Sequence, residues 1–145
     1  MPGAEHILRF PATLAAYEQA FAELRCTLDA QAVEAKARYN AELIFEEIVT
    51  NIICHGCGHG PHGTIEVSLG FADGAIVMKF CDNGPAFDPR GHKVAEISSI
   101  EEARIGGLGL ELVRRASAGI DYQRTPQDEN HLTVTVAARW NRDEG

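Results

Sequence analysis

The sequence has few of the residues that mark several protein classes. Among 145 residues there are 4 cysteines and 13 Lys and Arg against 21 Asp and Glu, for a formal net charge of -8. This charge argues against a nucleic-acid groove or an anionic membrane surface as the main partner. The scattered cysteines suggest no disulfide framework, so a cytoplasmic chain with reduced thiols is the simplest interpretation, with Cys26 and Cys81 expected as small buried residues.

Long hydrophobic runs are also missing. No apolar stretch has the length that a membrane-spanning helix needs, and residues Met1 to His6 lack the basic and apolar regions of a secretory signal. Hydrophobic residues make up 45% and charged residues 23% of the chain, which is ordinary for a soluble globular protein. A chain of 145 residues can bury one sizeable core, so we expect a single domain over residues 1–145.

Hydrophobic periodicity predicts a mixture of helices and strands. Strands are expected at His6–Phe10, Thr64–Leu69, Ala75–Phe80, Ile120–Arg124 and His131–Trp140. Helices are expected at Leu14–Leu28, Glu34–His55 and Leu110–Ala118, with Gly56 and Gly119 ending the last two. This set predicts an α+β fold: a two-layer sandwich of a mixed, mostly antiparallel sheet with helices on one face.

The predicted helix 34–55 has two different faces. One face is apolar at three- and four-residue spacing, with Leu43, Ile44, Phe45, Ile48, Val49, Ile52 and Ile53. Glu47, Asn51 and His55 are four residues apart each time and therefore form a second row on the same helix. A carboxylate, a carboxamide and an imidazole in one row suit metal coordination and proton handling, although polar rows on amphipathic helices are usually only solvated.

Two glycine-containing stretches carry residues that are typical of ligand binding. After a predicted strand, Asp82 can accept a hydrogen bond from an exocyclic amine, and Gly84 lets a flat ring approach the backbone. The same Asp-Asn-Gly tripeptide is also a strong turn former. The segment 106–109, Gly-Gly-Leu-Gly, precedes a predicted helix, where unpaired N–H groups favour a phosphate; alone, it is also typical of a flexible loop.

Two loops are expected between these elements. The loop from Cys54 to His62 contains the thiols and imidazoles that tetrahedral zinc accepts. Its spacing matches no paired-cysteine zinc module, so a flexible surface loop is the preferred interpretation. Pro85 to Ile105 is predicted to be a long loop with one short helix near Val94 to Glu102, and loops of this length are usually functional or disordered.

The order of these motifs resembles the nucleotide-binding boxes of the GHKL (histidine kinase-like) ATPase superfamily. The three matching boxes are Glu47-x-x-x-Asn51 on a helix, Asp82-x-Gly84 after a strand and Gly107-x-Gly109 before a helix. Within the superfamily, the residues of these boxes and their neighbours are most similar to the bacterial anti-sigma factor serine/threonine kinases. The resemblance extends from the first strand to Trp140 and implies a Bergerat-type ATP-binding fold.

The resemblance implies a role for each matched residue. Asn51 would ligate Mg²⁺ between the ATP phosphates, and Glu47 would be the general base that accepts a proton from a serine hydroxyl. Asp82 would hold the adenine amine, with Gly84 leaving room for the ring. Residues 87–105 would form an ATP lid from which Arg104 or Lys93 reaches a phosphate. The other cofactor-binding positions would be His55, Ala86, Gly106, Gly107, Leu108 and Gly109.

The sequence departs from the family pattern at two points. Ala86 stands where many relatives carry a second glycine, which affects the hinge of the lid more than nucleotide binding. The chain also lacks a helical hairpin with a phosphoacceptor histidine, so a complete histidine kinase is not expected.

The resemblance implies a Mg-ATP-binding serine kinase. It would phosphorylate a serine of an anti-anti-sigma (antagonist) protein and sequester a sigma factor, with no direct contact to nucleic acid or membrane. Two alternatives stay open: a non-catalytic, ATP-gated regulatory binding module, and a detached ATP-binding domain of a two-component-like system. Glu47 favours the enzyme, because adenine and phosphate binding alone need no carboxylate beside the γ-phosphate. The sequence leaves the oligomeric state open, including a homodimer.

Overall fold

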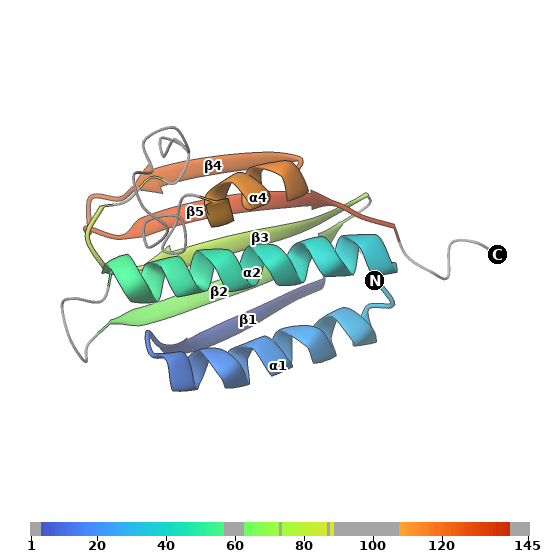
Figure 1. The fold of residues 1–145 in the computed structure, drawn as a ribbon, viewed down its shortest axis with the longest axis horizontal. Coiled ribbons are helices and arrows are strands. Elements are labelled where there is room, and N and C mark those ends of the chain that lie inside the picture. Colours follow the sequence, from blue (N-terminus) through green and yellow to red (C-terminus); the bar gives the residue numbers. More distant parts are fainter. Residues whose placement is uncertain (1–3, 57–62, 73, 87, 89–107, 140–145) are drawn as a thin grey trace.

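The chain forms a layer of helices packed on one face of a sheet (Figure 1). The computed structural model describes residues 4–56, 63–72, 74–86, 88 and 108–139. Its helices are α1 (Leu14–Ala30), α2 (Ala35–Gly56) and α4 (Leu108–Ala116). Its strands are β1 (Ala4–Pro11), β2 (Thr64–Ala72), β3 (Ala75–Asp82), β4 (Gly119–Arg124) and β5 (Asn130–Ala137).

The sheet has the strand order β1-β2-β3-β5-β4, and each pair of neighbouring strands is antiparallel. The predicted two-layer α+β fold is therefore confirmed. The sequence predicted a mixed, mostly antiparallel sheet, and the five described strands are antiparallel throughout. Within the described ranges, no helix is long and apolar enough to cross a membrane.

The core lies between the sheet and the helices because both layers present apolar rows to each other. In β2, Ile65, Val67, Leu69 and Phe71 are buried while the residues between them are more exposed, as expected for a strand with one covered face. The buried row of α2 includes Ile44, Phe45, Ile48 and Val49. Phe45 is the centre of an aromatic cluster, with ring centroids 6.1–6.3 Å from those of Phe10, Tyr17, Phe21 and Phe80.

Several predicted boundaries differ from the structure near α4 and β5. The helix was predicted to end at Ala118, but it ends at Ala116, and the Ala118 N–H donates to the Thr135 carbonyl of β5, 2.7 Å away, instead of to a carbonyl of the helix. Gly119 therefore begins β4 instead of ending a helix. The last strand was predicted to reach Trp140, but it ends at Ala137, opposite the first residue of β3.

The first strand was predicted to end at Phe10, but β1 extends to Pro11, whose missing N–H is tolerated because β1 is an edge strand. The expectation that Cys26 and Cys81 are buried was wrong. Cys26 is exposed on α1, and Cys81 is partly exposed because it alternates in β3 with the buried Phe80 and Asp82. Gly56 is the last residue of α2.

Candidate functional site

The C-terminal half of α2 carries the first part of the site. The side chain of Asn51 is buried, with 4% of its surface exposed. Its amide nitrogen donates to the backbone carbonyl of Glu47, 2.8 Å away, so the amide oxygen Oδ1 points away from the helix backbone. This oxygen is buried and has no hydrogen-bond partner among the described residues. A buried acceptor without a partner costs about 1–3 kcal/mol, so the position is suited to a ligand that takes the oxygen.

An amide oxygen is also a ligand that Mg²⁺ accepts, and Mg²⁺ commonly uses few protein ligands because it keeps waters and substrate phosphates. The geometry of Asn51 therefore fits the magnesium-binding role that the sequence predicts. His55 lies one turn further along α2, and its side chain is outside the described part of the structure.

Glu47 lies against the beginning of α4. A Cβ atom added at Gly109 would overlap with the Glu47 carboxylate and would lie 3.0 Å from its Cδ atom. Glycine at this position therefore allows the carboxylate to approach the first turn of a helix that is 62 residues away in the sequence. The contact brings together the predicted base and the last glycine of the predicted phosphate-binding motif.

The environment of Glu47 changes its acidity. Burial raises the pKa of the Glu47 carboxyl above its ordinary value, and the neighbouring charge of Glu46 raises the pKa further. A carboxyl with a raised pKa is a stronger proton acceptor once it is ionised. Raised carboxyl pKa values are typical of general acids and bases, so the shift agrees with the predicted role.

This environment predicts a pH dependence. If Glu47 is the base that the resemblance implies, it acts only when ionised, so phosphoryl transfer should fall as the pH decreases through its raised pKa. Replacing Glu46 with glutamine removes the neighbouring negative charge, so the acidic limb of the kcat profile should move to lower pH. The profile of the wild type and the E46Q variant, measured with saturating ATP and partner, checks this. An acidic limb that does not move would show that another group controls it.

Asp82 begins the second part of the site, at the end of β3. Residues Asp82 and Ile65 are paired across β3 and β2, so the end of β3 lies beside the beginning of β2, at the same end of the sheet as the C-terminus of α2 (Figure 1). Asp82 faces the helix layer and is only 9% exposed. Its Oδ1 atom accepts the backbone N–H of Gly84 at 2.9 Å, which forms a tight turn immediately after the strand.

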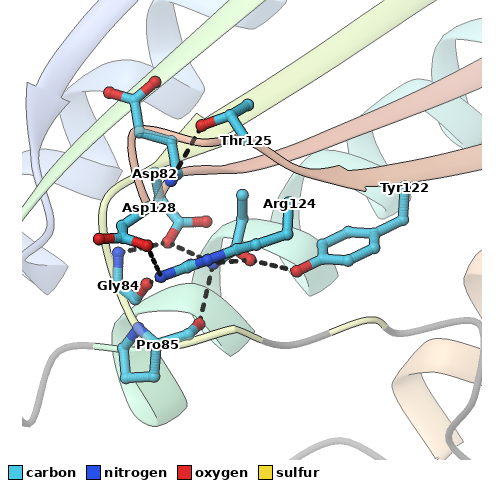
Figure 2. Close-up of polar contacts among 9 residues, drawn as sticks. Asp82, Gly84, Pro85, Tyr122, Arg124, Thr125 and Asp128 are labelled. Carbon is cyan, nitrogen blue, oxygen red and sulfur yellow. Dashed lines mark hydrogen bonds and ion pairs between the residues drawn. The ribbon is translucent and has the colours of Figure 1, made fainter.

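The turn after Asp82 is held by residues that the sequence analysis missed. Asn130 donates to Oδ1 of Asp82 at 3.0 Å and to the Pro85 carbonyl at 2.9 Å. Arg124 donates to the Gly84 carbonyl at 2.7 Å, and Figure 2 shows its guanidinium group directed at this turn. The signal was present in the sequence: Asn130 continues the inward-facing series Leu132, Val134 and Val136 and is the polar member of it.

Only some of the remaining predicted residues lie in the described part of the structure. Gly84 is buried, Ala86 is exposed, and Leu108 begins α4. Arg104, Gly106, Gly107 and Lys93 lie outside the described residues, as does the short helix expected near Val94 to Glu102. Most of the loop from Cys54 to His62 also lies outside them, while Cys54 itself is exposed at the end of α2. In the described ranges, no three His, Cys, Asp or Glu side chains gather as a metal site.

Known proteins resemble this chain in sequence. Residues 10–136 match the model of the histidine kinase-like ATPase domain. The chain is 31% identical over 102 residues to the serine/threonine-protein kinase BtrW of Bordetella bronchiseptica, covering 70% of this chain and 71% of that protein.

A solved structure also has this fold. A chain in the crystal structure of the SiaB–SiaC complex from Pseudomonas aeruginosa superposes with a TM-score of 0.65 and 17% sequence identity, over 90% of this chain and 88% of that one.

The family match and the identity to BtrW confirm the predicted resemblance to the superfamily and to its serine/threonine kinases. The chain belongs to the histidine kinase-like ATPase family.

Proposed function

We propose that the protein is a Mg-ATP-dependent serine kinase that phosphorylates a serine of an anti-anti-sigma partner and alternately holds a sigma factor. The observation that carries the proposal is the pair formed by Glu47 and Asn51. Glu47, with a carboxyl of raised pKa, lies one turn of α2 before Asn51, whose buried amide oxygen has no partner among the described residues. Nucleotide binding alone explains the amide oxygen but not the carboxylate.

Three parts of the site bind ATP: the end of β3, the start of α4 and the C-terminal half of α2. Asp82 accepts a hydrogen bond from the adenine amine, and the turn at Gly84 accommodates the ring. The first turn of α4 directs backbone N–H groups at the phosphates, where the positive end of the helix dipole favours negative charge. Asn51 would hold Mg²⁺, which would neutralise charge on the phosphates.

Glu47 acts on the serine of the partner. Its carboxylate accepts the hydroxyl proton as the serine oxygen forms a bond to the γ-phosphorus, and the bond from that phosphorus to the β–γ bridging oxygen breaks. The products are phosphoserine, ADP and a protonated Glu47, which returns its proton to solvent. Because Glu47 contacts Gly109, the base lies beside the helix turn that we assign to the phosphates.

The comparisons support the choice of substrate and partner. BtrW is a serine/threonine-protein kinase, and the SiaB–SiaC structure is a complex of two proteins, which supports a function exerted on a protein partner. The net charge of -8 favours a partner with a basic surface.

The proposal is tested with labelled ATP and the antagonist-like proteins that the same genome encodes. We expect label to be transferred to one partner in the presence of Mg²⁺, and to be lost when the acceptor serine of that partner is replaced by alanine. EDTA should abolish the transfer. A wild-type protein that binds Mg-ATP normally but labels none of these partners would refute the kinase activity.

Substitution of Asp82 tests the adenine site. Because Gly84 and Asn130 both donate to one side of this residue, an asparagine in its place will turn its oxygen toward them and its NH₂ group toward the base. D82N should therefore weaken ATP binding by about 10- to 150-fold, the value of one hydrogen bond to a charged group. GTP, which presents a carbonyl at the corresponding position, should lose less affinity.

Calorimetry with ATP and GTP checks the prediction for Asp82. The matched control is D121N, which makes the same change at an exposed position of β4. Equal loss of ATP affinity in both variants would contradict the assignment, because only Asp82 is expected to contact the base.

A further inference from the structure

Two buried polar residues, Asp82 and Asn130, are neighbours on paired strands of the sheet. Among the described residues, only Asn51, Asp82 and Asn130 are polar and buried. Asp82 and Asn130 are directly opposite across β3 and β5, and Arg124 of β4 is opposite Asn130 on the other side. The three residues thus form one row across three strands, on the face that the helices cover. Burying a polar group at such a position costs free energy unless the group is fully hydrogen-bonded. We therefore ask which hydrogen bonds these residues make and whether they serve the fold or the binding site.

The neighbours of Asn130 determine how its amide is oriented. The Tyr122 hydroxyl lies 2.5 Å and the Arg124 Nη1 atom 3.3 Å from Oδ1 of Asn130. A guanidinium group can only donate, so the atom that it faces must be the amide oxygen. The NH₂ group then points at two acceptors, Oδ1 of Asp82 and the carbonyl of Pro85. Turning the amide over would place donor against donor and acceptor against acceptor, so the orientation is fixed.

The fixed amide in turn determines what Asp82 can offer to a ligand. Oδ1 of Asp82 receives two N–H groups, from Gly84 and from Asn130. Among the described residues, no donor lies on its second oxygen, Oδ2. A base that enters the site therefore meets an acceptor in a fixed position. The 6-amino group of adenine can donate to it, whereas the 6-carbonyl group of guanine cannot.

The same residues hold the backbone on which the ring would lie. Arg124 donates to the Gly84 carbonyl at 2.7 Å, and Asn130 donates to the Pro85 carbonyl at 2.9 Å. Figure 2 shows Arg124 and Tyr122 reaching from β4 toward this turn. The turn and the Asp82 carboxylate are thus positioned by one hydrogen-bond network that is anchored in the β4–β5 hairpin.

We infer that Asn130, oriented by Tyr122 and Arg124, is a positioning residue that sets the preference of the site for adenine over guanine. This inference rests on the proposed binding of ATP at Asp82, but not on phosphoryl transfer. Asn130 acts through Asp82: it holds one carboxylate oxygen and so presents the other to the base. If the network only held the β4–β5 hairpin against β3, it would stabilise the fold without affecting which base is bound.

The test measures the ratio of the dissociation constants for GTP and ATP, together with the melting temperature. In N130D the new side chain keeps its size but directs an oxygen at Asp82, so the carboxylate loses its donor and meets a like charge. We expect this ratio to fall by about 10-fold or more. Y122F keeps its ring and removes a donor to the Asn130 oxygen, so a smaller loss of selectivity with a nearly unchanged melting temperature is expected. The matched control N40D, which changes an asparagine in the N-terminal half of α2, should keep the wild-type ratio.

The outcomes separate this inference from the proposed function. If folded N130D and Y122F both keep the wild-type ratio, the inference is wrong. If N130D does not fold, Y122F decides, and an unchanged ratio overturns the inference. If the wild type itself does not prefer ATP to GTP, both the adenine site and the inference fail. If the variants lose selectivity while the wild type phosphorylates no partner, the inference is supported and only the kinase activity is refuted.

Discussion

Replacing Glu47 with glutamine is expected to slow phosphoryl transfer to the partner serine by about 10²-fold or more, while ATP affinity stays unchanged or improves slightly. Glutamine keeps the shape of the side chain, so its contact with Gly109 can be retained. It removes the proton acceptor, and it also removes a negative charge from the surroundings of a polyanion. Single-turnover kinetics with labelled ATP measure the transfer rate, and calorimetry measures the affinity.

The stability of this variant gives an independent check on Glu47. Its pKa is raised in the folded state, so the native protein favours the protonated carboxyl, and this contribution to stability is lost as the pH rises through the folded-state pKa. E47Q should therefore unfold at a higher temperature than the wild type at neutral pH. It should show no such gain at a pH below the ordinary pKa of glutamate, where the carboxyl is protonated in both folded and unfolded states.

The matched control for Glu47 is the exposed neighbour Glu46. E46Q makes the same chemical change one residue away, and it should keep nearly full transfer at neutral pH. If E47Q also transfers phosphate at the wild-type rate, Glu47 is not the base. An ATP-gated binding module then becomes the better account of the protein, because the carboxylate would have no role that only the transition state requires.

Most of the fold could be predicted from the sequence because its signals are local. Alternation in β2 and the three- and four-residue spacing in α2 each lie within one element, and both elements occur where they were predicted. The ends of elements depend on partners far away in the chain. The end of β5 at Ala137, for example, is determined by where β3 begins, and no local pattern around Trp140 contains this information.

The site could be predicted only in part for the same reason. The row of Glu47 and Asn51 follows from helix geometry, and Asp82 follows from its motif. The contact between Glu47 and Gly109 joins residues 62 positions apart, and the bond between Asp82 and Asn130 joins residues 48 positions apart. Both depend on packing and on strand register, which periodicity does not specify. Sequence patterns named Glu47, Asn51 and Asp82, which we propose to contact the ligand, but they did not name Asn130, which holds Asp82 in place.

Replacing Asn51 with alanine is expected to remove the magnesium dependence of ATP binding and to abolish transfer as well. The amide oxygen is buried and has no partner among the described residues, so its loss removes a ligand without breaking a known contact of that atom. In the presence of Mg²⁺, ATP affinity should fall toward the value that the wild type shows in EDTA. Calorimetric titrations of both proteins with ATP, with Mg²⁺ and with EDTA, measure this.

The expected effect of this substitution on stability separates a binding role from a structural one. N51A breaks the hydrogen bond from the Asn51 amide nitrogen to the Glu47 carbonyl. Alanine is the best helix former, and the change also removes a buried acceptor that is costly when unpaired, so these effects offset each other and the free energy of unfolding of the nucleotide-free protein should change little. N40A makes the same change in the N-terminal half of α2 and should leave Mg-ATP binding intact. The opposite result has two parts: N51A loses stability, and the protein that stays folded binds ATP with the same magnesium dependence as the wild type. Asn51 would then be a structural residue and not a ligand of Mg²⁺. That result would leave the buried amide oxygen without a ligand and would remove the observation on which the magnesium site rests.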